Sequence, residues 1–215
     1  MANTAQRTAD LLRERITQGA LTPGTRLSEE ALGVAMGVSR NTLREAFRLL
    51  AHGRLVEHEP NRGVFVRRPS AADIADIYAV RTALETAGVR ALAAAPAGHL
   101  RAVTDAVADA EACAEIADWA GAGTADLRFH QALGALSCSP RIDTYLAGLL
   151  AELRLAFVTM PSQQLLHEPF LHRNRTIADL LTAGRTADAE DELHRYLQDA
   201  CRTVLGTLQL QEGPR

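Results

Sequence analysis

The chain has 215 residues, which is enough for two domains that each bury a core. Hydrophobic residues make up 47% and aromatic residues 4%, a composition that favours helices rich in alanine and leucine over sheets. The net charge of −3 argues against a nucleic-acid-binding protein, but residues 1–68 hold 11 arginines against 7 acidic residues. Residues 69–215 hold 12 arginines against 19 acidic residues, so a basic part precedes an acidic part.

The first 50 residues predict three helices. Residues 4–18 place apolar side chains at helical spacing, which predicts a supporting helix. Ser28 is a good N-cap for a second helix, and Ser39 is a good N-cap for a third. Gly37 lies between them and disfavours a continuous helix. This spacing predicts two short helices that meet at a sharp turn, as in a helix-turn-helix.

The third predicted helix has an apolar face and a basic face. The apolar face consists of Leu43, Ala46, Phe47 and Leu50, and the basic face of Arg40, Asn41, Arg44 and Arg48. An arginine can bind a guanine edge through two hydrogen bonds, and an asparagine can bind an adenine edge in the same way. The pattern therefore indicates a DNA recognition helix. The alternative is an ordinary helix whose arginines are solvated.

A predicted hairpin follows this helix. Residues 55–59 and 64–67 have the pattern of two strands, and Pro60-Asn61-Arg62-Gly63 has the composition of the turn between them. A hairpin that follows a helix-turn-helix is typical of a wing. The wing favours the recognition-helix interpretation over the solvated face.

Residues 23–66 together resemble the winged helix of the GntR transcriptional regulators. The resemblance implies that Arg40, Asn41, Thr42 and Arg44 contact bases or phosphates. It also implies that Arg62 and Gly63 form a wing tip that reaches the minor groove. Many family members carry Thr-Pro where this chain has Asn41-Thr42. The operator, meaning the DNA sequence that the regulator binds, is therefore not predicted by the resemblance.

The rest of the chain predicts helices without strands. Pro69 and Ser70 predict a linker at residues 69–72, so we expect one domain at residues 1–68 and another at residues 73–215. A glycine-containing break at residues 121–123 predicts that one helix ends there and that Thr124 caps the next. The expected fold class is mostly α, with an N-terminal winged helix-turn-helix, a small β wing and a C-terminal all-α helical bundle.

Four residues of the second part have side chains suited to bind a metal ion. Asp126 and His130 are four residues apart and therefore share one face of a predicted helix. His172 and His194 lie on two later predicted helices. Three imidazoles and one carboxylate are a suitable ligand set for a divalent ion. The alternative is that these histidines are ordinary core or surface residues.

Four segments of the second part resemble, in order, the FCD type of effector domain found in the FadR subgroup of GntR regulators. The segments are residues 76–94, 126–133, 139–142 and 172–197. The resemblance implies a divalent metal ion (Zn, Ni or similar) on Asp126, His130, His172 and His194. It also implies a small carboxylate effector that takes the open metal positions. Arg81 either faces that effector or forms an ion pair with Glu85 four residues later.

These predictions together describe a cytoplasmic transcriptional regulator that is a repressor and not an enzyme. We expect a homodimer on a short palindrome of double-stranded DNA, because two-fold symmetry presents two recognition helices. The N-terminus has no signal peptide, and no apolar run is long enough to span a membrane. Two alternatives remain: a regulator that responds to the metal ion itself, and a metalloenzyme built on the same four residues.

Overall fold

The structure is a computed structural model that describes residues 4–212 and divides into two units. The first unit consists of Met1–Ser70 and Ala151–Thr159, and the second of Ala71–Leu150 and Met160–Arg215. The segment Ala151–Thr159 therefore groups with the first unit, although the sequence places it in the range of the second domain. Among the described helices, none is both long enough and apolar enough to cross a membrane.

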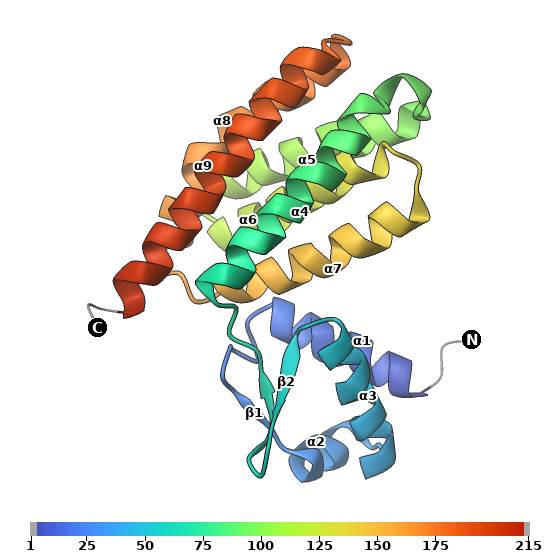
Figure 1. Ribbon diagram of the computed structural model, residues 1–215, viewed down its shortest axis with the longest axis vertical. Coiled ribbons are helices and arrows are strands. Elements are labelled where there is room, and N and C mark those ends of the chain that lie inside the picture. The colour runs from blue at the N-terminus through green and yellow to red at the C-terminus, as the bar shows by residue number, and fades with distance from the viewer. Residues whose placement is uncertain (1–3, 213–215) are drawn as a thin grey trace. The chain divides into compact units, whose positions relative to one another are not determined.

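The first unit contains three helices and a small sheet in its N-terminal part (Figure 1). These elements are α1 (Thr4–Thr17), β1 (Arg26–Leu27), α2 (Glu29–Met36), α3 (Arg40–His52), β2 (Val56–Glu59) and β3 (Gly63–Val66). The strands are antiparallel in the order β1-β3-β2, so β2 and β3 form the predicted hairpin. The sequence does not predict β1, because two residues are too few to show an alternation of apolar and polar side chains.

The two serine caps predicted from the sequence are present. The Ser28 hydroxyl accepts a hydrogen bond of 3.2 Å from the Ala31 N–H at the start of α2. The Ser39 hydroxyl accepts a hydrogen bond of 3.1 Å from the Thr42 N–H at the start of α3. Between the helices, Gly37 has a φ of 63°, a left-handed conformation that glycine adopts without steric cost. The helix-turn-helix geometry therefore follows from local sequence.

The core of the first unit includes a side chain from far along the chain. Leu12 of α1, Leu43 of α3 and Val66 of β3 are fully buried, and Leu155 is buried in the same apolar cluster. Arg154 fixes the neighbouring backbone, because its Nε donates a hydrogen bond of 3.1 Å to the Thr17 carbonyl oxygen. The segment around Leu155 is thus an integral part of the first unit.

The second unit is built of helices packed along one another (Figure 1). They are α4 (Ala71–Arg90), the 3-10 helix η1 (Leu92–Ala94), α5 (Ala97–Glu115), α6 (Trp119–Ala135), the part of α7 (Pro140–Phe157) up to Leu150, α8 (Gln163–Thr182) and α9 (Thr186–Glu212). Helix α4 packs against α9 and α6, and α5 and α8 also pack against α6. The predicted all-α second part is confirmed.

The predicted helix break at residues 121–123 is wrong. Helix α6 begins at Trp119, and its N-cap is Asp118, whose side chain accepts a 2.9 Å hydrogen bond from the Gly121 N–H. Gly121 and Gly123 both lie inside this helix, and a neighbouring side chain approaches each of them closely. A Cβ on Gly123 would overlap the His167 ring, and a Cβ on Gly121 would overlap the Asp118 carboxylate. Close packing, rather than chain reversal, explains these glycines.

Gly88 makes another close contact of this kind, and its substitution has a predictable effect. A Cβ at Gly88 would overlap the carbonyl oxygen of Leu133, which belongs to the backbone of α6 and cannot move aside. We expect Gly88→Ala to lower the free energy of unfolding by about 1–3 kcal/mol, despite the better helix propensity of alanine. Gly148→Ala is the control, because a Cβ there meets no atom within 4 Å. Equal unfolding midpoints in urea for the two variants would contradict this packing.

Candidate DNA-binding and ligand-binding sites

The side chains predicted to contact DNA lie on α3. Arg40, Asn41 and Arg44 are exposed, whereas Leu43 and Phe47 on the other side of the helix are buried. Thr42 is half-buried, and its hydroxyl lies 2.9 Å from the Ser39 hydroxyl. The helix therefore presents arginine and asparagine to solvent from its first turns, as a recognition helix requires.

Arg44 is held in place by a neighbouring helix. Its Nε lies 3.0 Å and 3.1 Å from the two carboxylate oxygens of Glu29 in α2. The Arg44 side chain remains 63% exposed. Because Glu29 bonds to Nε, the two terminal nitrogens of the guanidinium stay available. These are the nitrogens that can bind a guanine edge.

The predicted wing tip lies in the turn between β2 and β3. Arg62 is exposed, forms an ion pair with Glu59 and lies over the Phe65 ring at 5.3 Å from its centroid. Gly63 has a φ of 109° and Asn61 a φ of 62°, so the turn uses residue types that tolerate positive φ. The hairpin therefore exposes one cation at its tip.

The second unit contains a buried polar cluster. Arg81 and Glu85 of α4 are 1% and 0% exposed and form an ion pair of 2.8 Å between Nε and Oε1. The other Glu85 oxygen lies 2.7 Å from Nδ1 of His130 in α6. Because a carboxylate only accepts, His130 carries a proton on Nδ1. Burial raises the pKa of Glu85, but Arg81 and His130 outweigh burial and hold this pKa below its usual value.

Asp126 joins this cluster from the next turn of α6. Its Oδ1 lies 3.8 Å from the His130 Nε2 and accepts hydrogen bonds from Asn174 Nδ2 at 2.7 Å and Tyr196 Oη at 3.0 Å. Its other carboxylate oxygen lies 3.9 Å from Nδ1 of the buried His167. Burial raises the pKa of Asp126, but His130, His167 and the Asn174 bond lower it below its usual value. Asp126 is therefore a buried carboxylate held by donors.

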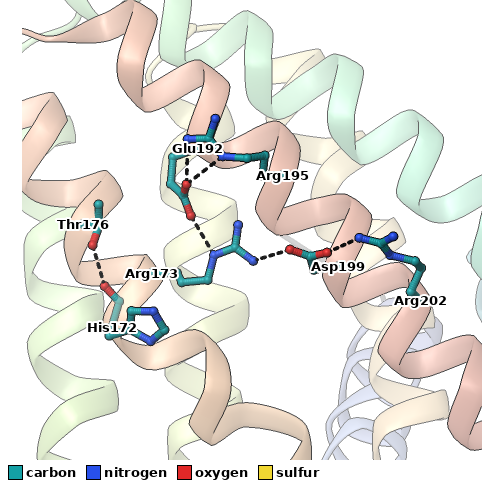
Figure 2. Close-up of polar contacts among 7 residues, drawn as sticks. All are labelled: His172, Arg173, Thr176, Glu192, Arg195, Asp199 and Arg202. Atoms are coloured by element: carbon teal, nitrogen blue, oxygen red, sulfur yellow. Dashed lines mark hydrogen bonds and ion pairs between the residues drawn. The ribbon is translucent and has the colours of Figure 1, made fainter.

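The other two predicted metal ligands, His172 and His194, lie outside this cluster. His172 is exposed, and Figure 2 shows it beside the ion pairs of Arg173, with its ring in none of the contacts drawn. His194 is half-buried, and its Nδ1 lies 3.0 Å from the Glu190 carbonyl oxygen. Asn174 and Tyr196 occupy the inward positions instead. Each follows the expected histidine by two residues, which is a rotation of about 200° around the helix.

The arrangement of these residues does not fit a divalent metal ion. The described residues contain no group of three or more histidine, cysteine or acidic side chains that could hold one. Asn174 and Tyr196 use their donor groups on Asp126, and His130 Nδ1 faces Glu85. The four predicted ligands are thus not brought together, because His172 and His194 do not lie on the faces of α8 and α9 that carry Asn174 and Tyr196 into the cluster.

Sequence reasoning did not identify Glu85, Asn174, Tyr196 and His167 as parts of one site, although it weighed Glu85 as a partner of Arg81. Within the cluster, the buried Arg81 Nη2 donor and the buried Asn174 Oδ1 acceptor have no hydrogen-bond partner. The Arg81 guanidinium also lies over the Tyr78 ring, 4.8 Å from its centroid. An unused donor and an unused acceptor in a buried cluster suit a small polar ligand.

A groove between α4 and α9 reaches the edge of this cluster. Its volume is about 380 Å³, and its lining residues are Ala75, Tyr78, Ala79, Thr82, Leu197, Gln198, Cys201 and Arg202. Tyr78 lines the groove and also covers Arg81. Burial raises the pKa of Tyr78 far above its usual value, so its hydroxyl stays protonated. Tyr78 therefore separates the groove from the buried charges.

Comparison with known proteins agrees with both units. Residues 4–66 match the family model described as bacterial regulatory proteins, gntR family, and residues 76–199 match the FCD domain model. The chain belongs to the GntR family. Members of this family with an FCD domain are DNA-binding transcriptional regulators, so this GntR regulator is not an enzyme.

Individual relatives of this GntR regulator support the same assignment. A transcriptional regulator from an unstable DNA locus of Streptomyces ambofaciens is 31% identical over 87% of this chain and 79% of its own length. A crystal structure of a GntR regulator from Rhodococcus sp. RHA1 has 44% identity and a TM-score of 0.89, covering 94% of this chain and 97% of that chain. The repressor RspR of Escherichia coli is 39% identical, but only over 37% of this chain and 35% of its own length.

Proposed function

We propose that this GntR regulator is a repressor that binds a short palindromic operator as a homodimer. The exposed Arg40, Asn41 and Arg44 on a helix-turn-helix are the observation that carries this proposal. Two copies related by two-fold symmetry place two such helices on successive major grooves. The names of two relatives support repression: RspR and a gluconate operon repressor of Bacillus subtilis, which is 40% identical over 40% of this chain.

We further propose that the buried cluster of the second unit binds the effector without a metal ion. With the imidazoles of His130 and His167 counted as neutral, its formal charges are one arginine against the two carboxylates of Glu85 and Asp126. A metal ion would add positive charge and attract a carboxylate effector, as the resemblance implied. Without it, a further anion beside two carboxylates is disfavoured. The cluster therefore favours an uncharged polar effector with one acceptor for Arg81 and one donor for Asn174.

The groove between α4 and α9 supplies a path for this effector. Its volume lies in the range typical of sites for small molecules, and it is bounded by Tyr78, whose ring covers Arg81. An effector in the groove reaches the Arg81 Nη2 atom when the Tyr78 ring rotates aside. That rotation exposes a charged group, so the ligand must offer a hydrogen-bond acceptor to compensate.

Selection of binding sites from a random pool of DNA duplexes tests the DNA-binding part of this proposal. We expect the full-length protein to enrich a two-fold symmetric sequence and to bind it as two chains per duplex, measured by light scattering of the complex. Enrichment of an asymmetric sequence, or one chain per duplex, would overturn the homodimer.

Thermal-shift screening of polyols, amides and small carboxylates, each with chelator, then identifies the effector class. A response to carboxylates alone would overturn the assignment to uncharged ligands.

A further inference from the structure

Glu152 is a buried carboxylate in a place that the DNA-binding function does not yet explain. It lies in the part of α7 that belongs to the first unit, and its side chain is 4% exposed. Removing a carboxylate from water is unfavourable unless cations and hydrogen bonds compensate. A buried Glu152 therefore needs cationic partners, and these partners show which part of the chain Glu152 holds in place.

Two arginines at opposite ends of the wing supply this compensation. Arg54 precedes β2, and its Nε lies 3.3 Å from the Glu152 Oε1. Arg67 follows β3, and it forms an ion pair with the same oxygen through Nη1. The Arg67 N–H also donates a 3.0 Å hydrogen bond to the Leu55 carbonyl oxygen. One carboxylate of α7 thus joins the two ends of the β2–β3 hairpin.

The wing depends on its base for its direction. A two-stranded hairpin is only marginally stable by itself, and β1 adds only a two-residue strand beside β3. Each wing strand has four residues, so the tip lies about 13 Å from the base. A small rotation at Arg54 and Arg67 therefore moves the Arg62 tip by a larger distance.

Helix α7 is also the element shared by both units. It runs from Pro140 to Phe157, and its residues up to Leu150 belong to the second unit. We propose that Glu152 is a positioning residue for the wing, because it holds both ends of the hairpin from the part of α7 that belongs to the first unit. This inference rests on the wing being part of the DNA interface.

The variant Glu152→Gln tests this role, because glutamine keeps the shape of the side chain and removes its charge. Loss of a negative charge from a DNA-binding unit by itself strengthens binding to phosphates. Loss of wing positioning has the opposite effect. We therefore expect operator affinity, measured by fluorescence anisotropy on the duplex enriched from the random pool, to fall by about tenfold. Hydrogen exchange at the amides of residues 56–66 should become faster, whereas exchange in α1 should not change.

Glu14→Gln is the matched control, because it removes the same charge from an exposed position on α1. Its affinity should equal or exceed that of the wild type. If Glu152→Gln does not fold, the double variant Glu152→Gln with Arg67→Gln removes both charges of this ion pair and should show the same tenfold loss. The inference is overturned if either folded Glu152 variant binds the duplex as Glu14→Gln does with unchanged exchange in the wing. If Arg44→Ala weakens binding in that case, the DNA interface itself stands.

Discussion

Arg81→Leu is expected to lower the free energy of unfolding of the second unit by about 3–5 kcal/mol. The substitution leaves the Glu85 carboxylate fully buried without its ion-pair partner at 2.8 Å. The fluorescence of Trp119, the single tryptophan, reports the unfolding of this unit in urea because it lies in α6. Burial lowers the pKa of Arg81, but Glu85 outweighs this and raises it, so the arginine is charged at any pH of the experiment.

Two further variants distinguish the effect of breaking the buried ion pair on stability from the effect of removing any arginine. Arg90→Leu removes an arginine whose side chain is 66% exposed and paired with Glu190, so it should cost no more than about 1 kcal/mol. The double variant Arg81→Leu with Glu85→Leu removes both charges and should recover part of the loss. If Arg81→Leu costs as little as Arg90→Leu, Glu85 is not a buried anion, and the proposed charge balance of the site fails.

Arg44→Ala is expected to weaken operator binding by about 1–3 kcal/mol and to relax base preference at one position of each half-site. The reason is that Glu29 already orients the Arg44 guanidinium and leaves its terminal nitrogens available. Repeating the DNA selection with the variant measures the base preference, and anisotropy measures the affinity. Arg185→Ala, on the exposed surface of the second unit, is the control. Unchanged affinity of a folded Arg44→Ala would remove Arg44 from the DNA interface.

The winged part could be predicted almost completely from sequence because its determinants are local. Ser28, Gly37 and Ser39 each act on neighbouring residues, and the structure has the cap or turn that each predicts. The glycines of α6 could not be interpreted in this way. Gly123 allows the close approach of His167 from α8, and the sequence around a glycine does not reveal contacts with a distant element.

The buried cluster was predicted in part, and the apolar pattern contained the missing information. On α8, Ile177, Ala178 and Leu181 are buried, and Asn174 lies three, four and seven residues before them on the same face. On α9, Leu193, Leu197, Ala200 and Val204 are buried, and this face includes Tyr196. Residue type favoured His172 and His194, whereas helical spacing favoured Asn174 and Tyr196. The positions of Asp126 and His130 satisfied both criteria, and these two residues do share the cluster.

The participation of α7 in both units has no counterpart in the sequence pattern. The pattern of Pro140–Phe157 indicates one amphipathic helix of the second domain. Its last residues differ from the rest of the helix in one buried acid, Glu152. The two arginines that pair with Glu152 are far from it in the sequence, and the nearer one, Arg67, is 85 residues away. Ion pairs at such separations are set by the tertiary fold. This is why a division of the chain at residue 68 or 72 misses the shared helix.

Release of the selected duplex by effector, with and without metal ions, shows whether the buried cluster binds its effector without a metal ion. The protein is bound to the fluorescent duplex and titrated with the effector found by thermal shift, once with chelator and once with Zn²⁺ or Ni²⁺. We predict the same release midpoint in both solutions, because Arg81 and Asn174 supply the free hydrogen-bonding groups of the site. Release that requires the metal ion, and that is driven by a small carboxylate, would contradict this account and support a metal site on Asp126 and His130.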